Sequence, residues 1–187
     1  MADFRAIEGV SSALVQVLKE GLAGADLGDV PVLLFGTDDF ARPLAQGVSV
    51  FLYRVSFDPT VHMRSEGPLP DESSAPPLSA LELRYLLTIW ADDPHAQLQL
   101  AGYVIERLER TPVITHDVLS AAGEGVFEAD ETVHLLADDL STKDLLRIWT
   151  SLGVGSYRLS LPYLARGVKL QSLGGNPAAP TRPRRNR

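Results

Sequence analysis

The sequence predicts an α+β fold: helices packed on a single, mostly antiparallel sheet of about four to six strands. Two patterns lead to this prediction. Apolar residues recur at helical spacing in some segments and alternate with a period of two in others. The order helix, strand, strand, strand, helix, strand, helix, strand lacks the regular alternation of a parallel sheet. The 187 residues, 45% of them apolar, suffice to bury the core of one domain.

The N-terminal part should contain one helix followed by two strands. Residues 6–19 are apolar at helical spacing, and the sequence GLAGADLGD should end this helix. The short run 32–35 predicts a strand that ends in a Gly-Thr-Asp-Asp turn. Residues 48–55 are apolar on both faces, which predicts a central strand. The helix has these core positions: Ile7, Val10, Leu14, Val17 and Leu18.

The next strand, residues 81–90, shows the clearest alternation and leads into a helix. Asp93 is a suitable N-cap and Pro94 suits the first helical position. The helix should run to about Arg110 and stop before Pro112. One face of the strand carries a continuous apolar row: Leu81, Leu83, Tyr85, Leu87 and Ile89.

The helix 94–110 is apolar over more than one face. Its main stripe consists of Leu98, Ala101, Ile105 and Leu108, which Leu100, Tyr103 and Val104 widen. Such a helix needs two packing partners. We expect either a subunit interface through Leu100, Tyr103 and Val104 or a helix sandwiched inside its own domain.

The C-terminal half should contain an extended piece, a strand and a helix. The sequences PVIT and HDVL are interpreted as extended, and residues 131–136 as a strand. Ser141 should cap the following helix, with Asp144 in capping-box position. The apolar face of this helix consists of Leu145, Ile148, Trp149 and Leu152.

From Tyr157 the apolar period changes to two, which predicts the last strand. Tyr157, Leu159, Leu161 and Tyr163 should face one way, and Arg158, Ser160 and Pro162 the other. Because proline cannot donate to a ladder, this strand should lie at an edge or have its free side at Pro162. The apolar phase then slips, which predicts a bulge between Leu164 and Gly167.

The glycine-rich turn Gly153-Val154-Gly155-Ser156 invites an interpretation as a phosphate loop or a nucleophile elbow. Both motifs need a strand before the turn and a helix after it, whereas the order here is the reverse. A helix C-terminus also carries partial negative charge, which repels phosphate. Gly153 should therefore be the left-handed residue that ends the helix.

Composition excludes several classes of function. The chain lacks cysteine, so disulfides and thiolate sites are excluded. No segment has the pattern of a membrane span or a signal peptide. The tail carries four arginines, so the rest of a chain of net charge −7 is near −11, which argues against a nucleic-acid partner. We expect a domain over 1–170, a Pro/Ser-rich loop at 56–80 and a flexible Pro/Arg-rich tail at 171–187.

The sequence offers no convincing catalytic, cofactor or metal site. Its histidines are His62, His95, His116 and His134. Asp92-Asp93-Pro94-His95 is explained as a helix start rather than a metal site, and His116 with Asp117 is an isolated pair. The adjacent aspartates at 38–39, 92–93 and 138–139 fall at turns and do not by themselves place two carboxyls across a substrate. We expect a non-enzymatic protein without a cofactor.

Several blocks resemble the cap, or tail-terminator, proteins of contractile injection systems, the phage-tail-like particles of the antifeeding-prophage type. The blocks are GVSVFLYRVSFDPTVHMR, PPLSALELRYLLTIWADDPHAQLQLAGYVIERLERTPVI and STKDLLRIWTSLGVGSYRLSLPYLARGVKL. Together with the first helix, the resemblance covers roughly residues 5–170. The Pro/Arg-rich tail lies outside it.

The resemblance implies a structural component without enzymatic activity. Six copies would form a ring that closes the end of the inner tube and the contractile sheath, through a heterologous interface. The particle would assemble in the bacterial cytoplasm and be released. The last strand and the segment after it could contact sheath or tube through Arg158, Ser160, Pro162, Arg166 and Lys169.

Two other interpretations of the sequence stay open. One is a soluble adaptor domain that binds a protein partner through the 56–80 loop and the tail. The other is an enzyme whose site would draw on Asp92, His95, His116 and Asp117, an interpretation that has the least support.

Overall fold

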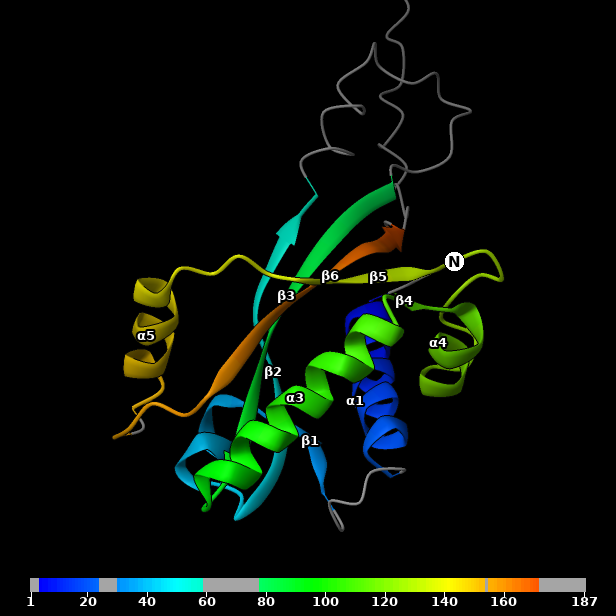
Figure 1. Cartoon of the computed structure of the whole chain (residues 1–187). Coiled ribbons are helices and arrows are strands. Elements are labelled where there is room, and N and C mark those ends of the chain that lie inside the picture. Colours follow the sequence, from blue (N-terminus) through cyan, green and yellow to red (C-terminus); the bar gives the residue numbers. More distant parts are fainter. Residues whose placement is uncertain (1–3, 24–29, 59–77, 154, 172–187) are drawn as a thin grey trace, which may run out of the picture.

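The computed structural model describes residues 4–23, 30–58, 78–153 and 155–171. It confirms the α+β class: one six-stranded sheet has the strand order β1-β2-β3-β6-β5-β4 and carries helices on both faces (Figure 1). The β1–β2 pair is parallel and all other pairs are antiparallel. The strands are β1 (Val32–Leu34), β2 (Gln46–Phe57), β3 (Leu78–Ala91), β4 (Val113–Ile114), β5 (Val133–Ala137) and β6 (Ser160–Gln171). The helices are α1 (Ala6–Ala23), the 3-10 helix η1 (Thr37–Ala41), α3 (Pro94–Arg110), α4 (His116–Ala122) and α5 (Thr142–Ser151).

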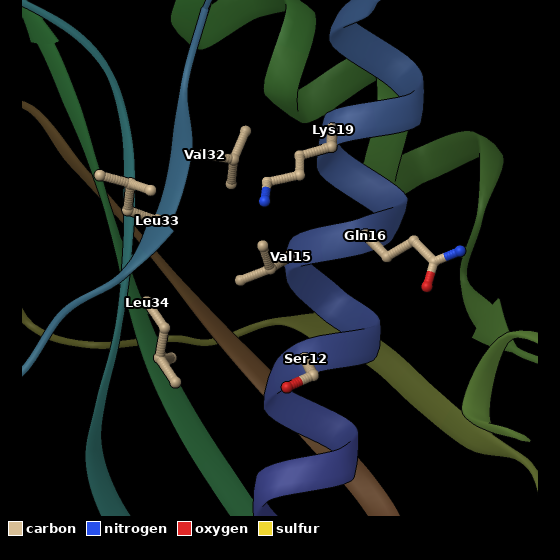
Figure 2. A pocket seen from close by; sticks show the side chains of 7 residues that line it. All are labelled: Ser12, Val15, Gln16, Lys19, Val32, Leu33 and Leu34. Carbon is tan, nitrogen blue, oxygen red and sulfur yellow. The ribbon is translucent and has the colours of Figure 1, made fainter. Parts of the chain in front are cut away.

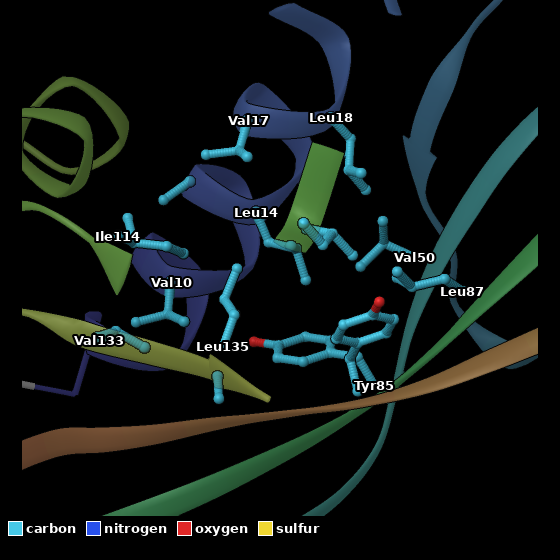
Figure 3. Packing of buried hydrophobic residues seen from close by; sticks show 14 of the residues in the cluster. Val10, Leu14, Val17, Leu18, Val50, Tyr85, Leu87, Ile114, Val133 and Leu135 are labelled. Atoms are coloured by element: carbon cyan, nitrogen blue, oxygen red, sulfur yellow. The ribbon is translucent and has the colours of Figure 1, made fainter. Parts of the chain in front are cut away.

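The main core lies between one face of the sheet and the helices α1, α3 and α4. The five residues predicted on one face of β3 are all buried in this core, as are the predicted apolar positions of α1 except Ile7, which is partly buried. Figure 3 shows side chains of α1 meeting those of β2 to β5, among them Leu14, Val50 and Leu135. Alternation along β3 therefore decides which face of the sheet the helices cover.

The opposite face of the sheet carries a smaller aromatic core beneath η1 and α5. Phe40 from η1 lies edge-on to Trp149 of α5, with ring centroids 5.7 Å apart, and close to Trp90 of β3. The indole N–H groups of Trp90 and Trp149 donate to the hydroxyls of Ser49 and Ser160. Each buried indole thus keeps a polar partner.

The helix boundaries confirm the predicted caps. The Asp93 carboxylate accepts from the Ala96 amide at 2.8 Å, and the Ser141 hydroxyl accepts from the Asp144 amide at 3.2 Å. Gly153 has φ +68°, as expected for a glycine that ends a helix.

Two predictions about helices need correction. The first helix continues to Ala23, beyond the predicted end at 19. A Cβ at Gly21 would lie 2.5 Å from the Arg107 side chain, which crosses from α3, so this glycine permits close helix packing rather than ending the helix. HDVL belongs to the helix α4 and is not extended; only Val113–Ile114 is a strand there.

The position of the last strand in the sheet was predicted only in part. β6 lies between β3 and β5, so it is not an edge strand. The carbonyl of Pro162 accepts a hydrogen bond from the Asp138 amide, just past the end of β5. Because the N and the C=O of one strand residue point to the same side, the nitrogen of Pro162 also points toward Asp138. The missing N–H therefore faces the point just past the end of β5, where no described strand continues beside β6, which is the alternative that the sequence left open. The predicted central strand β2 lies between β1 and β3.

The predicted bulge in β6 is present at Gly167. Leu81 pairs with Val168 while Glu82 pairs with Arg166, so Gly167 is the extra residue. Its φ of +92° is accessible mainly to glycine. The bulge restores the apolar phase, so that Val168 returns to the main core.

Candidate assembly surfaces

The helix α3 presents a different apolar surface from the one its sequence suggested. Leu100 and Val104 are buried inside the main core, 2% and 0% exposed, and Tyr103 is half-buried. Leu98 and Ile105 point outward, 65% and 41% exposed. The helix is therefore packed on its own domain through one face and keeps a narrow apolar ridge, Leu98 and Ile105, available to another molecule.

The five residues proposed for sheath or tube contact occupy different environments. Ser160 is buried and bonded to Trp149, so it belongs to the aromatic core. The Arg158 guanidinium lies 5.9 Å from the Trp90 ring centre, a cation–π distance. Pro162 is half-buried, whereas Arg166 and Lys169 are exposed on the same strand.

A network of charged side chains lies on the same face of the sheet as α5, on the part of that face that α5 does not cover. Arg84 donates to Asp138 and, at 3.3 Å, to Glu82. Glu82 also accepts two hydrogen bonds from Arg166, at 2.6 and 3.1 Å. The hydroxyl of Tyr53 donates to the second oxygen of Asp138 at 2.9 Å. The network joins β2, β3 and β6 to the connection between β5 and α5.

Charge and burial in this network have electrostatic consequences. Burial, reinforced by the hydrogen bond to Asp138, raises the pKa of Tyr53 to about 12. The hydrogen bond to Asp138 also raises the pKa of Arg84. Sequence reasoning missed this network because its members are far apart in the chain. The one available signal was the pair Glu82 and Arg84, the two charged residues of a strand that is mostly apolar.

Two apolar grooves open on the surface. One, of about 450 Å³, lies between α1 and β1. Figure 2 shows Val15 and Lys19 pointing from α1 toward β1, while Gln16 points away. The other, of about 340 Å³, lies between β2 and α5 and is lined by Thr37, Phe51, Tyr53, Arg147, Ile148, Ser151 and Leu152.

The candidate catalytic residues are not brought together as a metal site. Within the described ranges, no three His, Cys, Asp or Glu side chains are grouped so that they could hold a metal ion. His116 contacts Ser120 within α4, and Asp93 caps α3. His62 and the segment 59–77 lie outside the described residues, as does 172–187. No described helix has the length and apolarity that crossing a bilayer requires.

Two solved structures share this fold. The sheath/tube terminator of the extracellular contractile injection system PVC, in its extended state, matches with a TM-score of 0.56 and 17% identity, covering 94% of this chain and 61% of that one. The tube-terminating cap of the anti-feeding prophage matches with a TM-score of 0.56 and 20% identity, covering 87% of this chain and 54% of that one. The chain thus spans a little over half the length of either terminator.

A search among curated proteins gave no match. The family model described as the Pvc16 N-terminal domain matches residues 9–182, a range that includes every strand and helix from β1 to β6 and most of α1. This chain therefore belongs to the Pvc16 N-terminal domain family.

Proposed function

We propose that this chain is a structural cap of a contractile injection particle. Six copies form a ring that closes the distal end of the inner tube and the sheath. The observation that supports this most strongly is the family match over residues 9–182, together with a fold shared by two terminators of such particles. The particle assembles in the bacterial cytoplasm and is then released, and the cap needs no cofactor or catalytic residue.

The ring requires two different patches on each copy, because a closed cyclic assembly other than a dimer uses a heterologous interface. We place one patch on the ridge of α3, Leu98 and Ile105, in place of the buried residues Leu100 and Val104. Full burial of an exposed side chain of this size gains about 1.5–3 kcal/mol, and covering Leu98 and Ile105, which are 65% and 41% exposed, gains a corresponding fraction of it, which favours covering them.

Contact with sheath or tube is assigned to the exposed part of β6 and to the tail beyond it. Arg166 and Lys169 offer charged groups there, while Ser160 is withdrawn into the aromatic core. We propose the division of the chain accordingly: a terminator domain over 1–170 and a contact arm over 171–187.

The test is the mass of the purified protein, alone and mixed with the tube protein of the same particle. Mass photometry and negative-stain images should show six-membered rings, free or seated at tube ends. A chain that stays monomeric at every concentration and leaves tube ends bare would contradict the proposal. Truncation after 171 should keep the ring and weaken attachment to the sheath.

A further inference from the structure

One stretch of β2 has an open edge. β1 pairs only with Val48, Ser49 and Val50, and the chain then turns away into η1. From Leu52 to Ser56, no described strand lies beside β2 on that side. Five residues are close to the typical length of a strand.

The direction of the backbone groups can be derived from two hydrogen bonds. The Val50 carbonyl accepts from Phe35 on the β1 side, whereas the Asp58 amide donates to Ala80 of β3. The bulge between Leu52 and Arg54 reverses the alternation between these points. The N–H and C=O groups of Leu52 and Val55 therefore point to the open edge, and nothing in the described part of the chain bonds to them.

One positively charged side chain beside this edge lacks a negatively charged partner among the described residues. Arg54 stands directly opposite Arg84 in the β2–β3 register, an arrangement that is unfavourable for two like charges. Arg84 is neutralised by Asp138 and Glu82. Arg54 is exposed and forms no ion pair with any described residue. A carboxylate supplied from outside would complete the pair.

The edge also borders an apolar recess. Phe51 and Tyr53 of β2 line the 340 Å³ groove against Ile148 and Leu152 of α5. On the other face of the sheet, Val55 is 45% exposed. A strand added beside β2 would find apolar contacts on both faces and Arg54 at a position without ladder bonds, where facing side chains come closest.

We infer that the open edge of β2 accepts an extended segment of another polypeptide by strand addition, with a carboxylate beside Arg54 and an apolar side chain over the groove. Main-chain hydrogen bonds to Leu52 and Val55 hold the segment, and the side chains select it. The arginine-rich tail of a second copy is disfavoured because Arg54 and Arg147 repel it. The inference goes beyond the ring and is independent of it.

The probe is the synthetic peptide acetyl-Leu-Val-Glu-Val-Thr-Val-amide, titrated to millimolar concentration into ¹⁵N-labelled protein. Amide shifts should concentrate at residues 52–56 and around the groove. A peptide with Lys in place of Glu should bind roughly threefold to tenfold more weakly, as expected for losing an exposed ion pair and gaining a repulsion. A peptide of residues 172–187 should not bind there.

Three variants separate strand addition from surface adhesion. Val55→Pro removes an N–H that points to the open edge and leaves the β2–β3 ladder intact, so it should abolish peptide binding, whereas Val55→Thr should retain it. Arg54→Glu should reverse the preference between the Glu and Lys peptides.

Three results would overturn the inference. The first is no shift at 52–56 with either peptide. The second is binding that Val55→Pro does not affect. The third is binding that occurs only after residues 60–76 are replaced by a short Gly-Ser linker, which would assign the edge to this chain itself. Ring formation is measured separately by mass, so failure of either proposal is recognised independently.

Discussion

The hydroxyl of Tyr85 in β3 lies 2.9 Å from the hydroxyl of Ser11 in α1. Ser11 gives its only proton to the carbonyl of Ile7, at 2.7 Å, so Tyr85 is the donor between the two. Both residues are buried, and burial raises the pKa of Tyr85. This hydrogen bond links the first helix to the middle of the sheet within the apolar packing of the main core.

Removing the acceptor of this bond and removing its donor should lower the free energy of unfolding by different amounts. Ser11→Ala leaves the Tyr85 hydroxyl buried without that acceptor and should lower the free energy of unfolding by about 1–3 kcal/mol. Tyr85→Phe leaves Ser11 bonded to Ile7 and should cost about 1 kcal/mol. Urea unfolding of both single variants and the double variant checks this, and equal losses in the two single variants would contradict it.

Stability should fall at alkaline pH in a way that depends on Tyr53. Its pKa is raised from 10.0 to about 12, so the stabilisation from the protonated hydroxyl is complete below pH 10 and is lost as pH rises toward 12. Tyr53→Phe should lower stability at neutral pH and show a shallower decline above pH 10. Tyr85 and Tyr163 remain in both proteins, so the difference between the two curves isolates Tyr53. Parallel curves from pH 8 to 11.5 would be the contrary result.

Two glycine-to-alanine changes should have opposite signs. Gly167→Ala places a Cβ on a residue with φ +92°, 3.4 Å from the Thr132 carbonyl oxygen, and should cost about 1–3 kcal/mol. Gly102→Ala lies in α3 with open space around its Cβ and should stabilise by about 0.5–1 kcal/mol. Thermal unfolding followed by circular dichroism compares them. A stabilising Gly167→Ala would exclude the bulge geometry.

Substitutions in α3 should separate folding from assembly. Leu98→Glu with Ile105→Glu changes only exposed positions, so the fold should persist while the ring is lost. Leu100→Glu with Val104→Glu places two carboxylates in the core and should unfold the protein. Circular dichroism reports the fold and mass photometry the ring. If rings still form with the first pair of substitutions, Leu98 and Ile105 are not part of the subunit interface.

Sequence patterns predicted the elements that depend on local spacing. The alternation of β3, the caps at Asp93 and Ser141, the left-handed Gly153 and the bulge at Gly167 are all consequences of neighbouring residues. The short helix α4 was missed because its seven residues carry less than two full helical repeats of a pattern.

Patterns of spacing could not show which apolar residues the rest of the chain would cover. The spacing placed Leu98 in the main apolar stripe of the helix and Leu100 beside it, yet α1 and the sheet bury only Leu100. The position of β6 also depended on a distant event, since Pro162 is tolerated inside the sheet only because β5 ends beside it. The network around Arg84 likewise depends on hydrogen bonds between residues up to 85 positions apart, as in the Tyr53–Asp138 pair.

The pairing of β3 with β6 has a consequence for biosynthesis. Leu81 pairs with Val168 and Thr88 with Ser160, so the middle of the sheet joins segments that leave the ribosome far apart in time. Loop closure over such a distance is slow, and β3 remains without its second neighbour until about residue 171 has been translated. During that interval the backbone edge of β3 that later pairs with β6, from Leu81 to Thr88, is open to chaperones and to other nascent chains, so the rate of translation through the later strands should affect yield.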